Sequence, residues 1–387
     1  MAKIKNYNLG NSLLSNFKFY SSYSKFDKES NKFETWSDSV NRVFDKMHGI
    51  KYKDLLESNV LFKEYYDFAK SKYNEKYVLA SQRSLQFGGE PILRHNAKLY
   101  NCTTSYCDRV KFFQEAMYLL LCGCGVGFSV QYPHVNKLPK IKERSNKSKL
   151  FVIPDSIEGW ADAIGVLMSS YFEGDVPFPK YQNCHISFDY SEIRPKGSMI
   201  SGGFKAPGAD GLRNSIQKIE ELIEKLLNKP NFDGIIEPIV AYDIVMHLSD
   251  AVLSGGVRRS ATICLFSPND EKMLKAKTGK WFAENPQRGR SNNSVLLVKD
   301  DLTKEDFHKY FESVKSWGEP GFVFMHSVDN LVNPCVSEDT YVMTSNGAYQ
   351  VRDLIGKKFK AVVNGVEYDT LSGGFWKTGT KQLYKLT

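Results

Sequence analysis

Cysteines are the residues of this chain whose type and spacing most directly suggest chemistry. The 387-residue sequence contains seven of them, at positions 102, 107, 122, 124, 184, 264 and 335. Their irregular spacing does not fit the disulfide framework of a small secreted domain, which leaves catalysis, metal binding or simple burial as roles. Cys122 and Cys124 form a Cys-x-Cys pair, but no second pair with suitable spacing completes a zinc site. We therefore expect no metal site. Cys102, in LYNCTTSYC, is a candidate redox cysteine; the alternative is a small buried hydrophobic residue.

Two segments rich in arginine are candidates for binding a nucleotide. Arg258 and Arg259 follow a Gly-Gly turn in SGGVRRSATICLF, residues 254–266, where a helix gives way to a strand. Their planar guanidinium groups could contact phosphates or a base edge. The alternative is a glycine that ends a helix, followed by two solvated arginines. The segment QRGRSNNSV enters a second strand and could hydrogen-bond ribose or phosphate.

The elements that must position these residues alternate between helix and strand. KFFQEAMYLLL (111–121) predicts an apolar helix, which CGCGVG ends, and FSVQY (128–132) predicts a short strand. These glycines follow a helix and precede a strand, which reverses the order of a dinucleotide-binding loop, so we exclude that kind of site. Further helices are predicted at 156–172, 212–229 and 238–253, and buried strands at 261–266, 293–298 and 322–325. This alternation is typical of an α/β fold.

The two ends of the chain differ in composition and pattern from its central part. Residues 1–75 are aromatic and charged, with apolar residues at steps of three and four, and predict a helical region. Residues 76–334 carry the α/β pattern, within which the Lys/Ser/Asn-rich stretch 140–149 predicts a surface loop. Residues 335–387 are rich in Thr, Val, Gly and Tyr, with turns at SNG, VNG and SGG, and predict a small all-β module.

Composition and charge limit the classes of partner. The chain is 42% apolar, has no run of about 18 apolar residues and lacks the features of a secretion signal at its start, which favours a cytoplasmic protein without a membrane segment. A formal charge of +8 suits an anionic ligand. The basic residues are spread out and no nucleic-acid-binding motif is visible, so a small polyphosphate is expected rather than direct contact with nucleic acid.

A series of segments resembles one enzyme family in order along the chain. They are ETWSDSVNRV (34–43), RSLQFGG with YNC (83–89 and 100–102), LLLCGCGVGFSV, DSIEGWADAI, IRPKGSMISGGFKAPG, SGGVRRSATICLFSP, RSNNSV, and GEPGFVF followed by NPC. Through residues 17–334 the chain resembles the monomeric, adenosylcobalamin-dependent (class II) ribonucleoside-triphosphate reductases.

The resemblance implies a ten-stranded α/β barrel in which a finger loop carries a cysteine at its tip. With adenosylcobalamin as cofactor, that cysteine becomes a thiyl radical and removes the 3'-hydrogen of a ribonucleoside triphosphate; a pair of cysteines then supplies the reducing equivalents. Cys102 matches the first of that pair, whose partner would lie beyond residue 387, as would the cobalamin-binding segment. Asn333 matches the finger-loop asparagine. The glutamate expected two residues after the cysteine is missing, because Glu338 is out of register.

The resemblance also implies an effector site and a reductant. GGVRRSA matches the loop that reports a bound deoxynucleotide effector to the substrate base, and thioredoxin or a similar dithiol would reduce the enzyme. The residues that we expect to contact substrate or effector are Gly255, Gly256, Arg258, Arg259, Ser260, Asn292 and Asn293.

At Cys335 the family pattern NPCGE gives way to VSEDTYVMTSNGAYQVRDL, which looks like the first block of an intein. A splicing domain needs a nucleophile as its first residue, so that the preceding peptide bond can shift from nitrogen to sulfur as a thioester. Cys335 fits that role, with Pro334 as the acyl donor. The other matching positions are Asp339, Thr340, Thr344 and Gly347. The alternative is a family-specific insertion after an ordinary active-site cysteine.

The next intein block, with its Thr-x-x-His, and a terminal His-Asn are not found before residue 387. We therefore expect an N-terminal piece, either of a split intein that splices in trans with a partner carrying the C-terminal half, or of a truncated reading frame. After splicing, the thiyl cysteine of the mature enzyme would be the first residue of the downstream half. The competing interpretations are a catalytically inactive nucleotide-binding remnant and a protein that is chiefly a self-processing element.

Overall fold

The computed structural model describes residues 9–27, 30–200, 204–253, 261–298, 303–332, 341–363 and 366–369. The chain forms two compact units, Met1–Asn333 and Pro334–Thr387. Within the described ranges, no helix is both long and apolar enough to cross a lipid bilayer.

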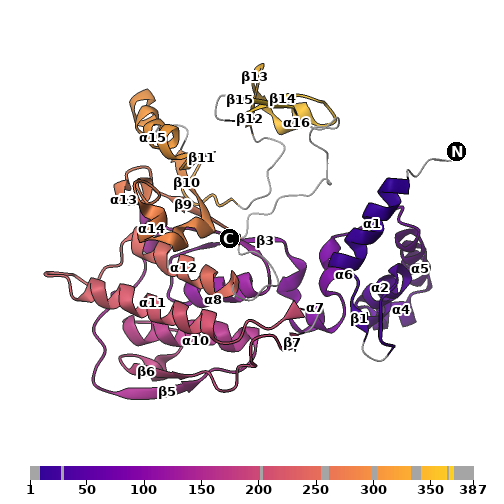
Figure 1. Ribbon diagram of the computed structural model, residues 1–387, viewed down its shortest axis with the longest axis horizontal. Helices are drawn as coiled ribbons and strands as arrows, with labels where there is room; N and C mark the ends of the chain where they lie inside the picture. Colours follow the sequence, from indigo (N-terminus) through magenta and orange to yellow (C-terminus); the bar gives the residue numbers. More distant parts are fainter. Residues whose placement is uncertain are drawn as a thin grey trace. The chain divides into compact units, whose positions relative to one another are not determined.

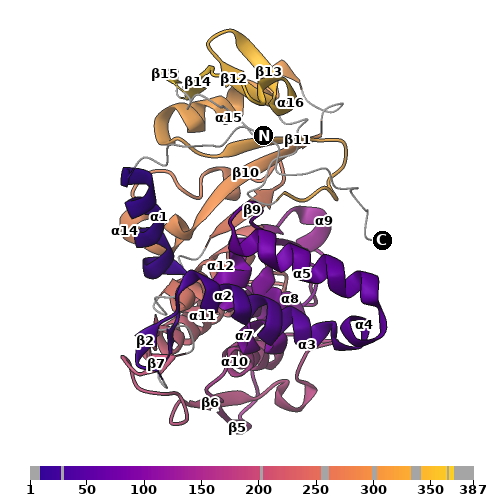
Figure 2. The same ribbon diagram turned by 90° about the vertical axis from the view of Figure 1, so that its right-hand side faces the viewer.

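The first unit begins with a helical region that has its own small core. Val40, Val43, Met47 and Tyr73 form this core together with residues from beyond position 75, among them Leu85. Helix α2 lies beside α5 (Figures 1 and 2). The helices therefore continue past the predicted limit at residue 75. They are α1 (Leu9–Ser22), α2 (Trp36–Val43), the π-helix η1 (Phe44–His48), α3 (Gly49–Lys51), α4 (Lys53–Ser58), α5 (Val60–Asn74), α6 (Gln82–Phe87), α7 (Glu90–Arg94) and the 3-10 helix η2 (Asn96–Leu99), with the two-residue strands β1 (Phe26–Asp27) and β2 (Lys32–Phe33) between α1 and α2.

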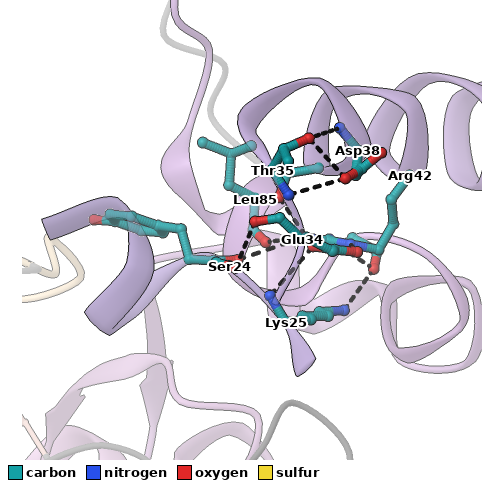
Figure 3. A network of polar contacts seen from close by, with 10 residues as sticks. Ser24, Lys25, Glu34, Thr35, Asp38, Arg42 and Leu85 are labelled. Carbon is teal, nitrogen blue, oxygen red and sulfur yellow. Dashed lines mark hydrogen bonds and ion pairs between the residues drawn. The ribbon is translucent and has the colours of Figure 1, made fainter. Parts of the chain in front are cut away.

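A polar network joins the start of α2 to the end of α6 (Figure 3). Arg42 makes a two-pronged ion pair with Glu34, with nitrogen–oxygen distances of 2.7 and 2.8 Å, and also donates to the backbone carbonyls of Leu85 and Gly88. Lys25 donates to the same Gly88 carbonyl at 2.8 Å. Burial raises the pKa of Glu34, but the hydrogen bonds and charge of Arg42 outweigh it and hold that pKa below its ordinary value. The network therefore ties ETWSDSVNRV to RSLQFGG, two of the segments that carry the resemblance.

Removing the carboxylate of this network should lower the stability of the helical region. Glu34→Gln leaves the Arg42 charge buried without a counterion, and we expect a loss of about 3 kcal/mol in the free energy of unfolding, measured with urea. Because the pKa of Glu34 is lower in the folded state, its stabilisation is complete above the ordinary pKa of a glutamate. That stabilisation should disappear as the pH falls through the folded-state pKa, and the variant should lack this pH dependence. Equal stability of both proteins at pH 7 would contradict this account.

A five-stranded, all-parallel sheet forms the centre of the first unit. Its order is β11-β10-β9-β4-β3, and each neighbouring pair runs parallel. The strands are β3 (Cys102–Tyr106), β4 (Gly125–Ser129), β9 (Thr262–Phe266), β10 (Ser291–Val298) and β11 (Gly321–Met325). Parallel strands require crossover connections, which the helices between them supply.

Four helices share the main hydrophobic core with this sheet, and α8 contacts strands β3 and β4 directly (Figure 1). Helix α8 (Lys111–Leu121) contacts both α10 (Ile157–Tyr171) and α12 (Pro238–Leu253), and α12 contacts α11 (Asp210–Leu227). The apolar stripe of α11 is buried, which confirms the helix predicted from its spacing, and Pro238 begins α12 as predicted. The remaining elements of this unit are α9 (Tyr132–Val135), β5 (Ser148–Val152), η3 (Pro179–Tyr181), β6 (His185–Asp189), β7 (Met199–Ile200), β8 (Phe204–Lys205), α13 (Glu271–Leu274), α14 (Trp281–Glu284), η4 (Pro286–Arg290) and α15 (Lys304–Trp317).

Two predictions about local structure differ from what is observed. The strand expected at 128–132 is β4, Gly125–Ser129, so the glycines of GVG lie inside the strand and not in a loop. The stretch 140–149 is mostly exposed, as predicted for a surface loop, but it is anchored: the Arg144 side chain is buried between the carboxylates of Glu220 and Glu224, each at 2.8 Å, and Ser148 begins β5. In both places the difference comes from a contact between residues distant in sequence.

The second unit contains a four-stranded antiparallel sheet of order β13-β12-β14-β15. Thr344 is buried at the β12–β13 turn, where its hydroxyl donates to the Gly347 carbonyl at 2.8 Å and accepts from the Asn346 amide. Gly347 has a φ of 105°, a left-handed backbone angle that favours glycine. The elements are β12 (Tyr341–Thr344), β13 (Gly347–Gln350), the one-turn helix α16 (Val351–Leu354), β14 (Lys360–Val363) and β15 (Val366–Asp369).

Candidate functional site

Cys102 begins β3 and lies beside the bare backbone of its neighbour β4. Cys102 is in register with Gly125, and a Cβ built on Gly125 would lie 3.6 Å from the Cys102 sulfur. Gly127, two residues further along β4, projects toward the same face of the sheet because side chains alternate along a strand. The GVG sequence therefore leaves this face of the sheet without side chains at the two β4 positions nearest Cys102, and the next β4 side chain on this face is that of Ser129.

The loop that leads to Asn333 crosses this same face. A Cβ on Gly127 would lie only 2.1 Å from the Val332 carbonyl oxygen, so no other residue fits at position 127 without moving the loop. The opposite face of β4 carries Val126 and Phe128, which are buried in the main core, and Phe128 packs near Phe112 of α8. The helices thus cover one face of the sheet, while Cys102 and the approach to Asn333 share the other.

A buried arginine ties the residue just before Cys102 to the chain just before β4. Arg83, of which only 2% is exposed, donates from Nε to the Asn101 side-chain oxygen at 2.7 Å and also donates to the Gly123 carbonyl. The Gly125 amide donates to the Asn101 carbonyl at 2.7 Å. Arg83 therefore joins RSLQFGG, YNC and CGCGVG into one cluster around the starts of β3 and β4. The sequence did not indicate this role, since a lone arginine is normally exposed.

A second candidate site is a cavity of about 380 Å³ bordered by α7, α8, α10 and α12. Ala251 and Val252, which line it, lie near the end of α12, and only Leu253 separates Val252 from the glycine-arginine segment 254–260 in the sequence. Segments DSIEGWADAI and IRPKGSMISGGFKAPG contribute further walls. The principal lining residues are Lys25, Gln86, Phe87, Glu90, Arg94, His95, Lys98, Cys122, Asp155, Ser156, Trp160, Arg194 and Gly208.

Basic groups dominate the polar lining of this cavity. Burial, followed by the charge of Arg42, lowers the pKa of Lys25 to about 8, although Glu34 opposes this effect. Burial also lowers the pKa of Lys98. Arg94 pairs with Glu90, and Arg194 pairs with Asp155 at the start of α10. Both lysines are partly buried, and an anionic ligand that entered the cavity would favour their charged forms.

Most of the residues predicted from the motifs lie outside the described ranges. These are Gly255, Gly256, Arg258, Arg259 and Ser260 of the effector loop, and Asn333, Pro334, Cys335, Asp339 and Thr340 at the junction. Of the others, Asn293 is buried in β10, where its side-chain oxygen accepts from the Ser291 hydroxyl at 2.7 Å, and Asn292 is exposed. Tyr242 of α12 also bonds Ser291, at 3.0 Å. The structure therefore gives Asn293 a role in packing the start of β10.

Curated proteins of one kind are similar to this chain. A probable adenosylcobalamin-dependent ribonucleoside-triphosphate reductase of Dictyostelium discoideum is 28% identical over 342 residues, which cover 79% of this chain and 42% of that protein. The adenosylcobalamin-dependent ribonucleoside-triphosphate reductase of Euglena gracilis is 27% identical, with 78% and 41% covered, and that of Lactobacillus gasseri is 25% identical, with 78% and 47% covered. The chain is a homologue of these reductases. No family model matches it.

The fold of this reductase homologue agrees with a solved structure. A B-12 dependent (class II) ribonucleotide reductase superposes with a TM-score of 0.65 at 21% identity, covering 90% of this chain and 54% of that one. This match confirms the predicted α/β fold of the reductase barrel region, with its parallel sheet and covering helices. The homologue spans less than half the length of the curated relatives that it matches.

Proposed function

We propose that residues up to Pro334 are the N-terminal part of a ribonucleoside-triphosphate reductase that makes deoxyribonucleotides by radical chemistry. The observation that carries this proposal is the shared bare face of β4, where Cys102 lies beside Gly125 and the loop leading to Asn333 lies over Gly127. A redox thiol and a radical-bearing loop must both reach one nucleotide, and these two elements approach one face of one sheet. The ten-stranded barrel would be completed by a C-terminal part.

The proposed reaction uses two sets of thiols. A cysteine at position 335 of the joined enzyme, as a thiyl radical, removes the 3'-hydrogen of the substrate and returns it at the end. The 2'-hydroxyl leaves as water, while the Cys102 thiol and a second thiol from the C-terminal part give up two electrons and their protons and become a disulfide. Thioredoxin or a similar dithiol then reduces that disulfide. Adenosylcobalamin, named for the relatives, would supply the initiating radical when bound, and we assign no residue of this chain to hold it.

We further propose that the cavity bordered by α7, α8, α10 and α12 takes a deoxyribonucleoside triphosphate effector. Four basic side chains, Lys25, Arg94, Lys98 and Arg194, line it, and two further lining residues, Ala251 and Val252, shortly precede in the sequence the segment expected to report the effector to the substrate. Guanidinium and ammonium groups are suited to phosphate oxygens.

Effector binding should take up a proton above pH 8. A triphosphate beside Lys25 would raise its pKa from about 8, so the affinity should be nearly constant from pH 7 to 8 and then fall by up to about tenfold per pH unit. Titration calorimetry at pH 8.5 in two buffers of different ionisation enthalpy measures the uptake directly. Lys25→Met should bind more weakly and take up less of a proton. If the unmodified protein takes up no proton when the effector binds, this placement of the phosphates is contradicted.

We propose that residues from Cys335 onward begin an intein. The buried Thr344 and the left-handed Gly347, bonded to each other at the β12–β13 turn, support this assignment because the intein pattern includes both. The Cys335 thiol would attack the Pro334 carbonyl, forming a thioester and freeing the amine of residue 335. A partner polypeptide would then complete splicing and supply the C-terminal reductase part.

The test of the reductase proposal is conversion of a ribonucleoside triphosphate by the joined protein. Co-expression with a partner that carries the C-terminal intein half and continues Cys-Gly-Glu should give a product that forms deoxyribonucleoside triphosphate with adenosylcobalamin and a dithiol present. Joined protein that binds nucleotide and forms no deoxynucleotide would instead support the inactive remnant.

A further inference from the structure

The segment Ser327–Val332, which follows β11, is held by polar side chains from the carboxyl ends of β3 and β4. The Tyr106 hydroxyl donates to the Asp329 carbonyl at 2.6 Å, and the Gln131 side-chain amide donates to the Val328 carbonyl at 2.9 Å. These contacts link residues about 200 positions apart in the sequence. Asn333, the predicted finger-loop asparagine, directly follows this segment in the sequence.

A buried histidine completes this set of contacts. His134, only 2% exposed, has Nδ1 at 2.8 Å from the Ser129 hydroxyl and Nε2 at 3.5 Å from a carboxylate oxygen of Asp329. Its ring centre lies 4.4 Å from that of Tyr106. Gln131 donates to the same Ser129 hydroxyl at 3.0 Å. Gln131 and His134 are buried polar side chains, which need hydrogen-bond partners, and both have a partner in residues 328–329.

The held segment has little regular structure of its own. Hydrogen bonds within the segment form a single turn. The Ser327 amide donates to the Asn330 side chain, the Asn330 amide donates to the Ser327 carbonyl, and the Asp329 amide donates to the Ser327 hydroxyl. The strand β11 ends before it, at Met325. Its position over Gly127 therefore depends on contacts with β3, β4 and α9.

We propose that Tyr106, Gln131 and His134 form a clamp that positions the loop leading to Asn333 and to the cysteine that follows it. The clamp is a structural assignment in its own right, and its consequence for catalysis rests on the proposed reductase function. A cysteine that abstracts hydrogen must be held within a fraction of an ångström, and a displacement of about 1 Å costs on the order of 100-fold in rate. These three side chains are positioning residues and need not touch the substrate.

Hydrogen exchange of the chain tests the clamp directly. The double variant Tyr106→Phe/Gln131→Met keeps the side-chain shapes and removes both donors to the backbone of residues 328 and 329. We expect peptides covering 326–332 to exchange about 10- to 30-fold faster, with peptides from β9 and β10 unchanged. Tyr100→Phe, which removes a hydroxyl from an exposed tyrosine just before β3, is the matched control and should leave exchange unchanged.

Unchanged exchange over 326–332 in the double variant would overturn the clamp. If the double variant exchanges faster throughout the sheet, the single variant Tyr106→Phe tests the clamp instead. We expect its peptides covering 326–332 to exchange about fivefold faster. In the joined reductase the double variant should lower kcat about 100-fold with KM for the nucleotide unchanged, and an unchanged kcat would refute the positioning role. An inactive parent protein would count against the reductase proposal, whereas the exchange result would still decide the clamp.

Discussion

Replacing Cys102 with serine should stop multiple turnover in the joined reductase. Cys102 begins β3 beside Gly125 of β4, on the face where the loop leading to Asn333 also lies, and under the proposed function its thiol reaches the nucleotide there. Serine keeps the size of the side chain and cannot form a disulfide, so the two electrons needed for each turnover are lost. We expect kcat with an external dithiol to fall about 1,000-fold.

The control for this prediction is Cys184→Ser. Cys184 is buried just before β6, and its thiol donates to the Gln182 carbonyl at 3.4 Å, a bond that a serine hydroxyl can replace. Turnover should remain normal in that variant. Normal turnover in Cys102→Ser would remove this residue from the redox pair and would leave it as a packing residue of β3.

Replacing Cys335 with alanine should abolish joining of the two polypeptides. Without a sulfur nucleophile the Pro334–Cys335 amide cannot become a thioester, and every later step of splicing depends on that intermediate. Co-expression with the partner followed by electrophoresis should show two unjoined chains. The expected loss of ligated product is at least about 100-fold.

Cys335→Ser is the informative comparison, because a serine hydroxyl can still attack the Pro334 carbonyl and form an ester. This variant should give slow but detectable joining. If Cys335→Ala joins the chains as well as the unmodified protein does, Cys335 is not the nucleophile, and the junction would be better described as an insertion after an active-site cysteine.

The helices were predictable from sequence because their signals are local. The stripe of Leu212, Ile216, Ile219, Ile223 and Leu226 has helical spacing, and all five side chains are buried on one face of α11. Lys111–Leu121 and Pro238–Leu253 likewise coincide with apolar segments that have clear ends. Such patterns need no information from the rest of the chain.

The candidate site was harder to predict because the residues that contact one another there are far apart in the sequence. Glycine is a poor strand former, so β4 was expected to begin after Gly127; the need for a bare backbone there comes from Val332, about 200 residues later. In the same way, Arg83 and His134 are polar residues that would be assigned to the surface. Their burial depends on Asn101 and Ser129, which come close only in the folded sheet.

The division of the chain at residue 334 is the central claim, and mass spectrometry of the joined protein tests it most directly. A proteolytic peptide in which Asn333-Pro334 is followed by Cys-Gly-Glu, with residues 335–387 absent from the product, is the predicted result. It would show that Pro334 ends the reductase part and that Cys335 leaves with the intein. Product in which Pro334 is still followed by Cys335-Val336, with no junction peptide after incubation with the partner, would contradict the account.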